Sequence, residues 1–370
     1  MIYLDSAATS LQKPRGVEHA VVRAMRSMAS PGRGGHSTAM MAADTVFTCR
    51  QELSKLFGVE NPEKVVFVSN ATHALNLAIF SLVKQGDPVV ISGYEHNAVV
   101  RPLASIGARV LTAEAPLFEP DAMVATFRRL LPLAKVAVCT HVSNVFGYIL
   151  PIEKIAALCQ EYRVPLIVDA SQSAGSLPID FQALGAEFLA MPGHKGLLGP
   201  QGTGVLICKN NARPLLYGGT GSNSIQSAMP DFLPDRLEAG THNVAGISGL
   251  LAGVRYIQVT TPATILAHER GLMRKLAANL RELPQLELFL SEDPALQSGV
   301  LSFRSTKINC ETIAETLDQY GIAVRAGLHC APLAHRTAST LETGTVRCSI
   351  SPFNTSEEIH RASEVMKQIL

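Results

Sequence analysis

The segment PLIVDASQSAGSLPIDFQALGAEFLAMPGHKGLLGPQGTGVLICK, residues Pro165–Lys209, decides the fold class. It contains three short runs, PLIVDAS, FLAMPG and GVLICK, in which nearly every position is apolar. Runs of this kind are typical of strands that are covered on both faces, because a half-exposed strand alternates apolar and polar residues. Polar and glycine-rich residues follow the first two runs, where parallel sheets bind their ligands beyond the carboxyl ends of the strands.

Four further runs of the same type precede this segment, and helical patterns separate most of them. They are KVVFVSN, PVVISG, ARVLTA and VAVCTHVSN. Alternation of strands and helices predicts an α/β fold with a mostly parallel sheet. Near Gly246 the pattern changes to long helices and a few short strands, which predicts a smaller α+β domain. We therefore expect a large domain over residues 16–245, a small domain over 246–370, and an N-terminal segment, 1–15, that packs with the small domain.

The composition is that of an ordinary globular protein without a strong charge. Its 370 residues are 47% hydrophobic, and 32 Lys and Arg against 31 Asp and Glu give a net charge of +1. A charge near zero gives no field for capturing nucleic acid, so nucleic-acid partners are not expected. The start, MIYLDSAATS, lacks the pattern of a signal peptide, and no later run has the apolar length of a membrane span. We therefore expect a cytoplasmic protein without membrane contact.

The seven cysteines are scattered along the chain and form no CxxC pair. This spacing predicts neither a disulfide framework nor a structural metal site. The closest grouping, His329, Cys330 and His335, lacks a second cluster of ligands, so no bound metal is expected.

Lys195 and Asp169 are the residue pair that indicates a chemistry. Lys195 follows the run FLAMPG, and Asp169 ends the run PLIVDAS, 26 positions earlier (195 minus 169). Pyridoxal phosphate (PLP) requires a lysine for a Schiff base and an acid that keeps its pyridine nitrogen protonated. Taken singly, Asp169 is typical of a helix cap and Lys195 of a solvated lysine, so only the combination carries the prediction. The glycine-rich pieces complete neither GxGxxG nor GxxxxGK[ST], which disfavours a dinucleotide or nucleoside triphosphate site.

The stretch SNATHALNLAI predicts the phosphate end of that site. Asn70–Thr72 follow the run KVVFVSN and open a helix, where free N–H groups and the helix dipole favour an anion. A plain helix cap is the alternative interpretation of the same residues.

Eight stretches occur in the order found in one group of enzymes. They are YLDSAATSLQKP, SNATHALNLAI, EHNAVVRPL, SNVFGYILPI, VDASQSAGSLPIDF, PGHKGLLGPQGTGVL, EAGTHN and RAGLHC. With these motifs the chain resembles, over essentially its whole length, a cysteine desulfurase of the short catalytic-loop type, one of the class-V aminotransferase-fold enzymes. The resemblance implies the PLP-dependent transferase (aspartate aminotransferase-like) fold, PLP as the cofactor and L-cysteine as the substrate.

The resemblance also implies a role for each residue of the site. Lys195 forms the Schiff base, Asp169 partners the pyridine nitrogen, and His96 stacks on the ring. The remaining cofactor contacts are implied for Ala71, Thr72, Asn144, Gln172, His194 and Thr241. Thr241 reaches the phosphate from the other subunit, which implies a homodimer with shared sites. Contacts to the substrate are implied for Asn144, Arg347, Arg325 and His36.

Two positions depart from the family pattern. Pro192 stands where relatives often have a hydroxyl residue that contacts the phosphate, and His73 stands where they often have an acid. Both departures leave Lys195 in place and put only the cofactor affinity in question. We also expect the glycines around Lys195 to let the backbone approach the cofactor and the facing subunit. Taken alone, Arg347 also fits a surface ion pair, and His96 a satisfied loop histidine.

Cys330 is the cysteine that selects the reaction. It lies in the polar loop RAGLHCAPLAH, where Arg325 and His329 are expected to favour the thiolate. Cys310, at the start of a predicted helix, is the rival because a helix dipole also favours a thiolate. The resemblance implies Cys330 as the nucleophile that takes sulfur from L-cysteine as a persulfide and leaves L-alanine. A sulfur-acceptor protein or a small thiol is then the next partner, as in iron–sulfur cluster assembly.

Other reactions on the same fold stay open at this point. They are those of a selenocysteine lyase, of another PLP-dependent β-eliminating enzyme and of a class-V aminotransferase. A non-catalytic sulfur-relay or scaffold protein is the alternative from a different class, and Lys195, Asp169 and Arg347 together argue against it.

Overall fold

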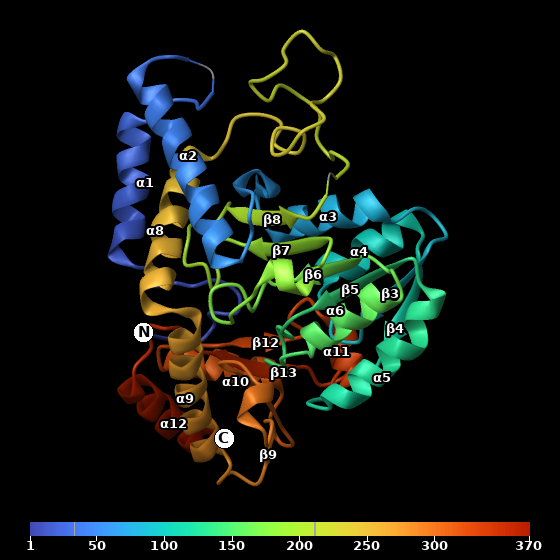
Figure 1. The fold of residues 1–370 in the computed structure, drawn as a ribbon. Helices are drawn as coiled ribbons and strands as arrows, with labels where there is room; N and C mark the ends of the chain where they lie inside the picture. The colour runs from blue at the N-terminus through green and yellow to red at the C-terminus, as the bar shows by residue number, and fades with distance from the viewer. Residues whose placement is uncertain (33, 211) are drawn as a thin grey trace.

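The computed structural model describes residues 1–32, 34–210 and 212–370. A seven-stranded sheet forms its centre (Figure 1). In spatial order the strands are β2 (Val65–Val68), β8 (Gly204–Cys208), β7 (Phe188–Pro192), β6 (Leu166–Asp169), β5 (Val136–Thr140), β3 (Pro88–Ser92) and β4 (Arg109–Ala113). Neighbouring strands are parallel except where β8 pairs with β7 and β2. These strands are the seven runs predicted from the sequence, so the mostly parallel α/β fold is confirmed.

Successive residues of the central strands enter two different hydrophobic cores. In β6, Leu166 and Val168 belong to one core and Ile167 to the other. The helices of the first core are α2 (Ser37–Leu56), α5 (Pro120–Leu130), α6 (Ile152–Glu161), α7 (Phe181–Leu184) and α8 (Val244–Thr260). The helices of the second are α3 (Ala71–Leu82) and α4 (Asn97–Ile106). Because both faces are covered, Leu166, Ile167 and Val168 are all apolar, rather than every second residue.

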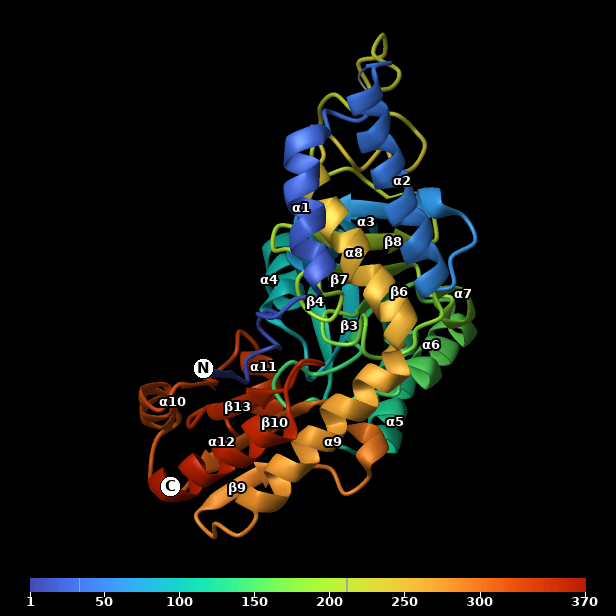
Figure 2. The same cartoon turned by 90° about the vertical axis from the view of Figure 1, so that its left-hand side faces the viewer.

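Helices α1 (Arg15–Ser27), α2 and α8 pack together beside the sheet, and α9 (Pro262–Leu280) leads away from them to the other end of the molecule (Figure 2). The contacts of α8 are mainly with α1 and α2. This packing favours a boundary near Thr261, between α8 and α9, over one at residue 245. The domain limits themselves stay a prediction.

Residues near the C-terminus form a second sheet, which is antiparallel. Its order is β12 (Arg325–Gly327), β13 (Thr345–Ser349), β10 (Val300–Ser305) and β9 (Leu286–Phe289). The helices of this region are α9, α10 (Cys310–Gln319), α11 (Pro332–Thr337) and α12 (Ser356–Ile369). The capping box predicted at the start of α12 is confirmed, because Thr355 and Glu358 each accept a hydrogen bond from the other's backbone.

The start of the chain joins this second region. Strand β1 (Ile2–Tyr3) pairs in parallel with β11 (Ile322–Ala323), and the amide of Ser349 donates to the carbonyl of Leu4 at 2.7 Å. Residues after β1 therefore run between the two sheets, towards the loops that follow β6 and β7.

Strand register brings the predicted site residues to one edge of the large sheet. Thr140 on β5 lies opposite Asp169 on β6, which lies opposite Ala190 on β7. The loops after these three strands therefore begin side by side. Within the described residues, no helix has both the length and the apolar content that crossing a membrane requires.

Candidate active site

Lys195 lies in the turn that follows β7 and lines a cavity with Asp169, Thr72, His96 and Asn144. Burial lowers the pKa of its amine to about 8, although the Asp169 carboxylate acts in the opposite direction. An amine with a pKa near 8 is partly unprotonated at neutral pH. Lys195 is therefore available as a nucleophile and as a base.

The glycines beside Lys195 have a structural reason that differs from the predicted one. A Cβ atom at Gly196 would lie 2.3 Å from the carbonyl oxygen of Ala174, and one at Gly193 would lie 2.1 Å from the hydroxyl of Thr203. Both positions need glycine because this chain's own atoms come so close. The glycines thus fix the turn against its surroundings, and an approach to a cofactor or a second subunit stays a prediction.

Asp169 ends β6 with its side chain in the cavity and with only 3% of the residue exposed. One carboxylate oxygen, Oδ1, accepts a hydrogen bond from the amide of Ser171 at 2.9 Å. The backbone of Asp169 is held on both sides by its strand neighbours. The carboxyl group is thereby held in one position in the lining of the cavity.

His96 is the N-cap of α4 and lines the same cavity. Its Nδ1 atom accepts a hydrogen bond from the amide of Ala98 at 3.0 Å, which leaves the proton of the neutral ring on Nε2. Burial lowers the pKa of His96 to about 4. His96 therefore presents an uncharged imidazole, which suits stacking on an aromatic ring.

The opposite end of the cavity is suited to an anion. Asn70 caps α3 by accepting from the amide of His73, and the first-turn amides of Ala71 and Thr72 lie outside the helical hydrogen-bond pattern. His194 faces the same space, and its Nδ1 lies 3.0 Å from the hydroxyl of Thr9. Burial lowers the pKa of His194 to about 4, so the ring carries no charge there.

The two departures from the family pattern lie at this anion end. Pro192 lines the cavity and offers no hydroxyl. The imidazole of His73 turns back to Ser69, with 3.3 Å between Nδ1 and the serine hydroxyl.

His36 and Thr241 do not reach Lys195 within one chain. His36 caps the start of α2, is exposed, and pairs with the hydroxyl of Thr38 at 2.8 Å. Thr241 is exposed and lines a separate cavity together with His73. The implied substrate contact of His36 and the implied phosphate contact of Thr241 therefore both need a second copy of the chain, and both stay predictions.

Arg347 lies on β13 and is 1% exposed. Its Nη1 donates to the carbonyl of Asn144 at 2.9 Å, and its Nη2 pairs with Asp5 at 2.6 Å. Its Nε is buried without a hydrogen-bond partner among the described residues. A buried guanidinium with an unpaired N–H group is suited to bind a carboxylate, to which it donates hydrogen bonds. The surface ion pair considered for Arg347 is wrong, because the side chain is buried.

Gln172 lies between the cavity and the N-terminal segment. Its Nε2 donates to the carbonyl of Ala7 at 2.9 Å, which turns the amide oxygen of the side chain away from that contact. Gln172 and Asp169 line the cavity together.

Cys330 is exposed, whereas the other six cysteines are buried. Both His329 and Cys330 have left-handed backbone angles, with φ of 50° and 56°. Two hydrogen bonds of 2.9 Å hold this strained loop, one from the amide of Asn97 to the carbonyl of Cys330 and one from the side chain of Asn144 to the carbonyl of His329. Because Asn144 also lines the Lys195 cavity, the loop with the thiol is tied to that cavity.

Arg325 is the cation beside the thiol, with 3.7 Å between its Nη2 and the sulfur of Cys330. The expectation that His329 also favours the thiolate is wrong. Burial lowers the pKa of His329 to about 2, so its ring carries no charge at neutral pH. Its Nε2 lies 3.1 Å from the hydroxyl of Thr345, away from the sulfur.

Cys310 does not have the environment that was considered for a rival nucleophile. It is 3% exposed, and its thiol donates to Glu311 at 3.1 Å. Burial and that hydrogen bond raise the pKa of Cys310 to about 11. The dipole of α10 is outweighed, and Cys310 is a protonated core residue.

A family model described as aminotransferase class-V matches residues 2–362. The chain belongs to the class-V aminotransferase family. A cysteine desulfurase from Klebsiella pneumoniae is 33% identical, with 100% of this chain and 93% of the relative covered. The apo structure of a cysteine desulfurase from Thermococcus onnurineus is 30% identical and has a TM-score of 0.90, with 100% of this chain and 94% of that one covered. A cysteine desulfurase from Escherichia coli, solved with an S-sulfonic acid, has a TM-score of 0.86 at 27% identity.

The cavity of this class-V aminotransferase family member fits PLP, the cofactor that the family implies. It combines a partly unprotonated amine at Lys195, a buried carboxylate at Asp169 and an anion-binding helix start at Ala71. These are the groups that the aldehyde, the pyridine nitrogen and the phosphate of PLP require.

Two further residues at the site were not singled out from the sequence. Glu95 is fully buried beside His96, and Asp5 holds Arg347. Both stand inside motifs that carried the resemblance, EHNAVVRPL and YLDSAATSLQKP. The order of the motifs drew attention to these stretches, but not to these two residues. Fully buried acids such as Glu95 are rare, so nothing in the sequence indicated one there.

Proposed function

We propose that the protein is a PLP-dependent cysteine desulfurase, which converts L-cysteine to L-alanine and leaves the sulfur on Cys330 as a persulfide. One observation carries the proposal: the exposed cysteine lies on a strained loop that Asn144 ties to the cavity of Lys195 and Arg347. The cysteine desulfurases among the relatives support the same reaction.

Several residues would hold PLP. Lys195 would supply the amine for the aldehyde, Asp169 the charge for the pyridine nitrogen, and His96 the stacking ring. The remaining contacts would come from Ala71, Thr72, Asn144, Gln172, His194 and, in a homodimer, Thr241 of the second copy. When bound, PLP supplies an electron sink for the bonds at the substrate Cα.

The protein side chains then have distinct tasks in the reaction. Arg347 binds the substrate carboxylate with its unpaired N–H edge, and Asn144 keeps the arginine in place through its carbonyl. Lys195 removes the Cα proton, because its amine is partly unprotonated at neutral pH. Arg325 stabilises the thiolate of Cys330.

Sulfur transfer is balanced between the substrate and Cys330. The Cys330 thiolate attacks the sulfur of L-cysteine, so that an S–S bond forms and the Cβ–S bond breaks. The electron pair of the broken bond stays with the three-carbon fragment, which takes up protons and leaves as L-alanine. The persulfide then passes to an acceptor protein or a small thiol. We propose a cytoplasmic role in sulfur mobilisation for iron–sulfur cluster assembly.

The test compares Cys330→Ser with Cys310→Ser, a matched change in a buried thiol. We expect the rates at which L-alanine and sulfide form from L-cysteine to fall to the level without enzyme in Cys330→Ser. Both rates should stay near those of the wild type in Cys310→Ser. Mass spectrometry of the wild type after L-cysteine should find the added sulfur on the peptide that contains Cys330. Normal turnover in Cys330→Ser, or added sulfur on Cys310, would refute the assignment.

A further inference from the structure

Glu238 is a buried acid that the proposed reaction does not use, and it stands shortly before Thr241 in the chain. Only 7% of the residue is exposed. Its Oε1 accepts hydrogen bonds from Nη1 of Arg50 at 2.8 Å and from the amide of Phe67 at 2.5 Å. Its Oε2 accepts from Nη2 of Arg50 and lies 2.6 Å from Nε2 of His242. Both oxygens of this carboxylate therefore have partners inside the chain.

Arg50 is the cation of this cluster, and 5% of the residue is exposed. It lies on α2, and its guanidinium is 4.6 Å from the centre of the Phe67 ring. Its Nη1 also donates to the carbonyl of Val65 on β2. Burial acts to raise the pKa of Glu238, but Arg50 and His242 outweigh it, so this pKa is lowered and the carboxyl is charged at neutral pH. A charged pair with two parallel hydrogen bonds fixes the directions of both side chains.

The loop that carries Thr241 is held at both of its ends. The contact between Glu238 and His242 closes one span of the chain, and Thr241 lies inside that span. Asn243 caps the start of α8, and its Nδ2 donates to the carbonyl of Gly202 at 3.1 Å. Thr241 itself is exposed, and its hydroxyl forms no hydrogen bond with any residue that the structure describes. The result is a free hydroxyl on a loop whose base is fixed.

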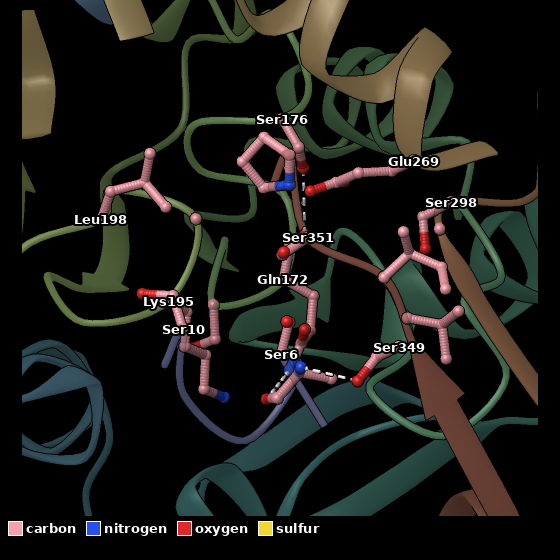
Figure 3. Close-up of a pocket in the computed structure, with 17 residues that line it drawn as sticks. Ser6, Ser10, Gln172, Ser176, Lys195, Leu198, Glu269, Ser298, Ser349 and Ser351 are labelled. Carbon is pink, nitrogen blue, oxygen red and sulfur yellow. Dashed lines mark hydrogen bonds between the residues drawn. The ribbon is translucent and has the colours of Figure 1, made fainter. Parts of the chain in front are cut away.

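Thr241 lies outside the surroundings of Lys195 in its own chain. One side of Lys195 is the cavity that contains Asp169, and the other side is a space lined by Ser10 and Gln172, among others (Figure 3). Among the described residues, Thr241 lines neither space. A fixed loop with a free hydroxyl is suited to serve a second copy of the chain, because a pre-organised contact loses less entropy when it forms.

A second route from Glu238 stays within one chain. Through the amide of Phe67 the carboxylate also contacts β2, which leads to Asn70 and the start of α3. Strand β2 is already held by β8 along its whole length, from Val65 to Val68. Residues 238–243, in contrast, belong to no helix or strand. The loop of Thr241 therefore depends more on Glu238 than β2 does.

We propose that Arg50 and Glu238 are positioning residues for Thr241, and that through it they act on the PLP phosphate site of the other copy in a homodimer. This inference rests on the proposed function, because it takes up the proposed contact of Thr241 with the phosphate in the second copy. The task of the pair is to keep the hydroxyl where that phosphate meets it. The pair therefore sets the affinity for PLP and leaves the chemistry of Cys330 unchanged.

The experiment measures PLP affinity, without turnover. Protein freed of PLP is titrated with it, and the visible absorption of lysine-bound PLP is followed. We expect Glu238→Gln to need about tenfold more PLP for half saturation, because one hydrogen bond to a charged group is worth about tenfold in affinity or more. Glu287→Gln is the matched control. It removes an exposed ion pair with Arg304 in the second sheet and should bind PLP like the wild type.

Further variants keep the test independent of folding. Glu238→Gln leaves the Arg50 charge buried without a partner, which can prevent folding. Arg50→Met combined with Glu238→Gln removes both charges, and this double variant should fold and show the same weakened binding. Arg50→Lys keeps a charge without the paired hydrogen bonds, so its affinity should lie between those of the wild type and Glu238→Gln. Circular dichroism verifies the fold of each variant.

Heterodimers show which copy Glu238 serves. Co-expression of Glu238→Gln and Lys195→Ala, each with its own affinity tag, yields heterodimers in which only the Glu238→Gln copy has the lysine for PLP. The phosphate site of that copy receives Thr241 from the Lys195→Ala copy, in which Arg50 and Glu238 are intact. We therefore expect these heterodimers to bind PLP with the affinity of the wild type.

Weak binding that persists in the heterodimers would overturn the proposal, because Glu238 would then act through Phe67 on the site of its own chain. Wild-type affinity in Glu238→Gln itself would overturn it as well. A wild type that gains no visible absorption with PLP would remove the proposed function, and this inference with it. Recovery in the heterodimers supports the positioning role even if L-cysteine is not turned over.

Discussion

Glu95 offers the sharpest test of the electrostatics of the site. It is 0% exposed, and its Oε1 accepts hydrogen bonds from the hydroxyl of Ser92 at 2.5 Å and the amide of Thr140 at 2.6 Å. Its Oε2 has no partner among the described residues. Burial raises the pKa of Glu95 from 4.5 to about 8, and the Asp169 charge adds to the rise. Glu95 is therefore a neutral acid at physiological pH, held between the strand ends.

The expected pH dependence follows from linkage. Because the folded-state pKa lies above the unfolded value, the stabilisation from this proton is fully present below about pH 4.5 and is lost as the pH rises through about 8. The slope reaches about 1.4 kcal/mol per pH unit, so about 2 kcal/mol is lost between about pH 6 and about pH 7.5. Glu95→Gln stays neutral at every pH and keeps the oxygen that Ser92 and Thr140 use.

The assay is urea unfolding of the wild type and Glu95→Gln at those two pH values. We expect the stability of the wild type, measured relative to the glutamine variant, to fall by about 2 kcal/mol between them. Glu95→Ala should instead lose about 1–3 kcal/mol at both, because the buried amide of Thr140 loses its acceptor. Parallel changes in the wild type and Glu95→Gln would show that Glu95 does not hold a proton in this range.

Three further outcomes are expected. Lys195→Ala should abolish turnover of L-cysteine while leaving the fold intact by circular dichroism; turnover near the wild-type rate would remove Lys195 from the chemistry. Asp5→Asn should lower the free energy of unfolding by about 3 kcal/mol, because it leaves the buried Arg347 charge uncompensated; an unchanged urea midpoint would contradict this. If Thr241 completes the site of the second copy, Thr241→Ala should be impaired, and mixing it with Lys195→Ala should restore activity through heterodimers that contain one intact site. No recovery on mixing would place Thr241 in its own chain's site or outside the chemistry.

The large sheet could be predicted from the sequence because its strands are covered on both faces, which gives apolar runs that are hard to mistake. The same logic placed Lys195 and Asp169 at strand ends. The burial and charge of the individual site residues were harder to predict than their places along the strands. His329 was expected to carry charge because it neighbours Cys330, but the fold buries its ring, and burial removes the charge.

Residues that act through distant contacts also escaped prediction. The pairing of Asp5 with Arg347 joins positions 342 residues apart, and no local pattern encodes it. Among the described residues of one chain, neither His36 nor Thr241 lines the cavity of Lys195, so their roles stay predictions.

The pairing between Asp5 and Arg347 also has a consequence for the order of folding. Closing a loop of this length is entropically costly, and contacts of large sequence separation form late. The seven-stranded sheet is complete by Cys208, whereas β1 needs β11 and Asp5 needs β13. We expect a refolding chain to regain its secondary structure and the space around Lys195 first. Its affinity for the substrate carboxylate should appear only when the two ends of the chain meet.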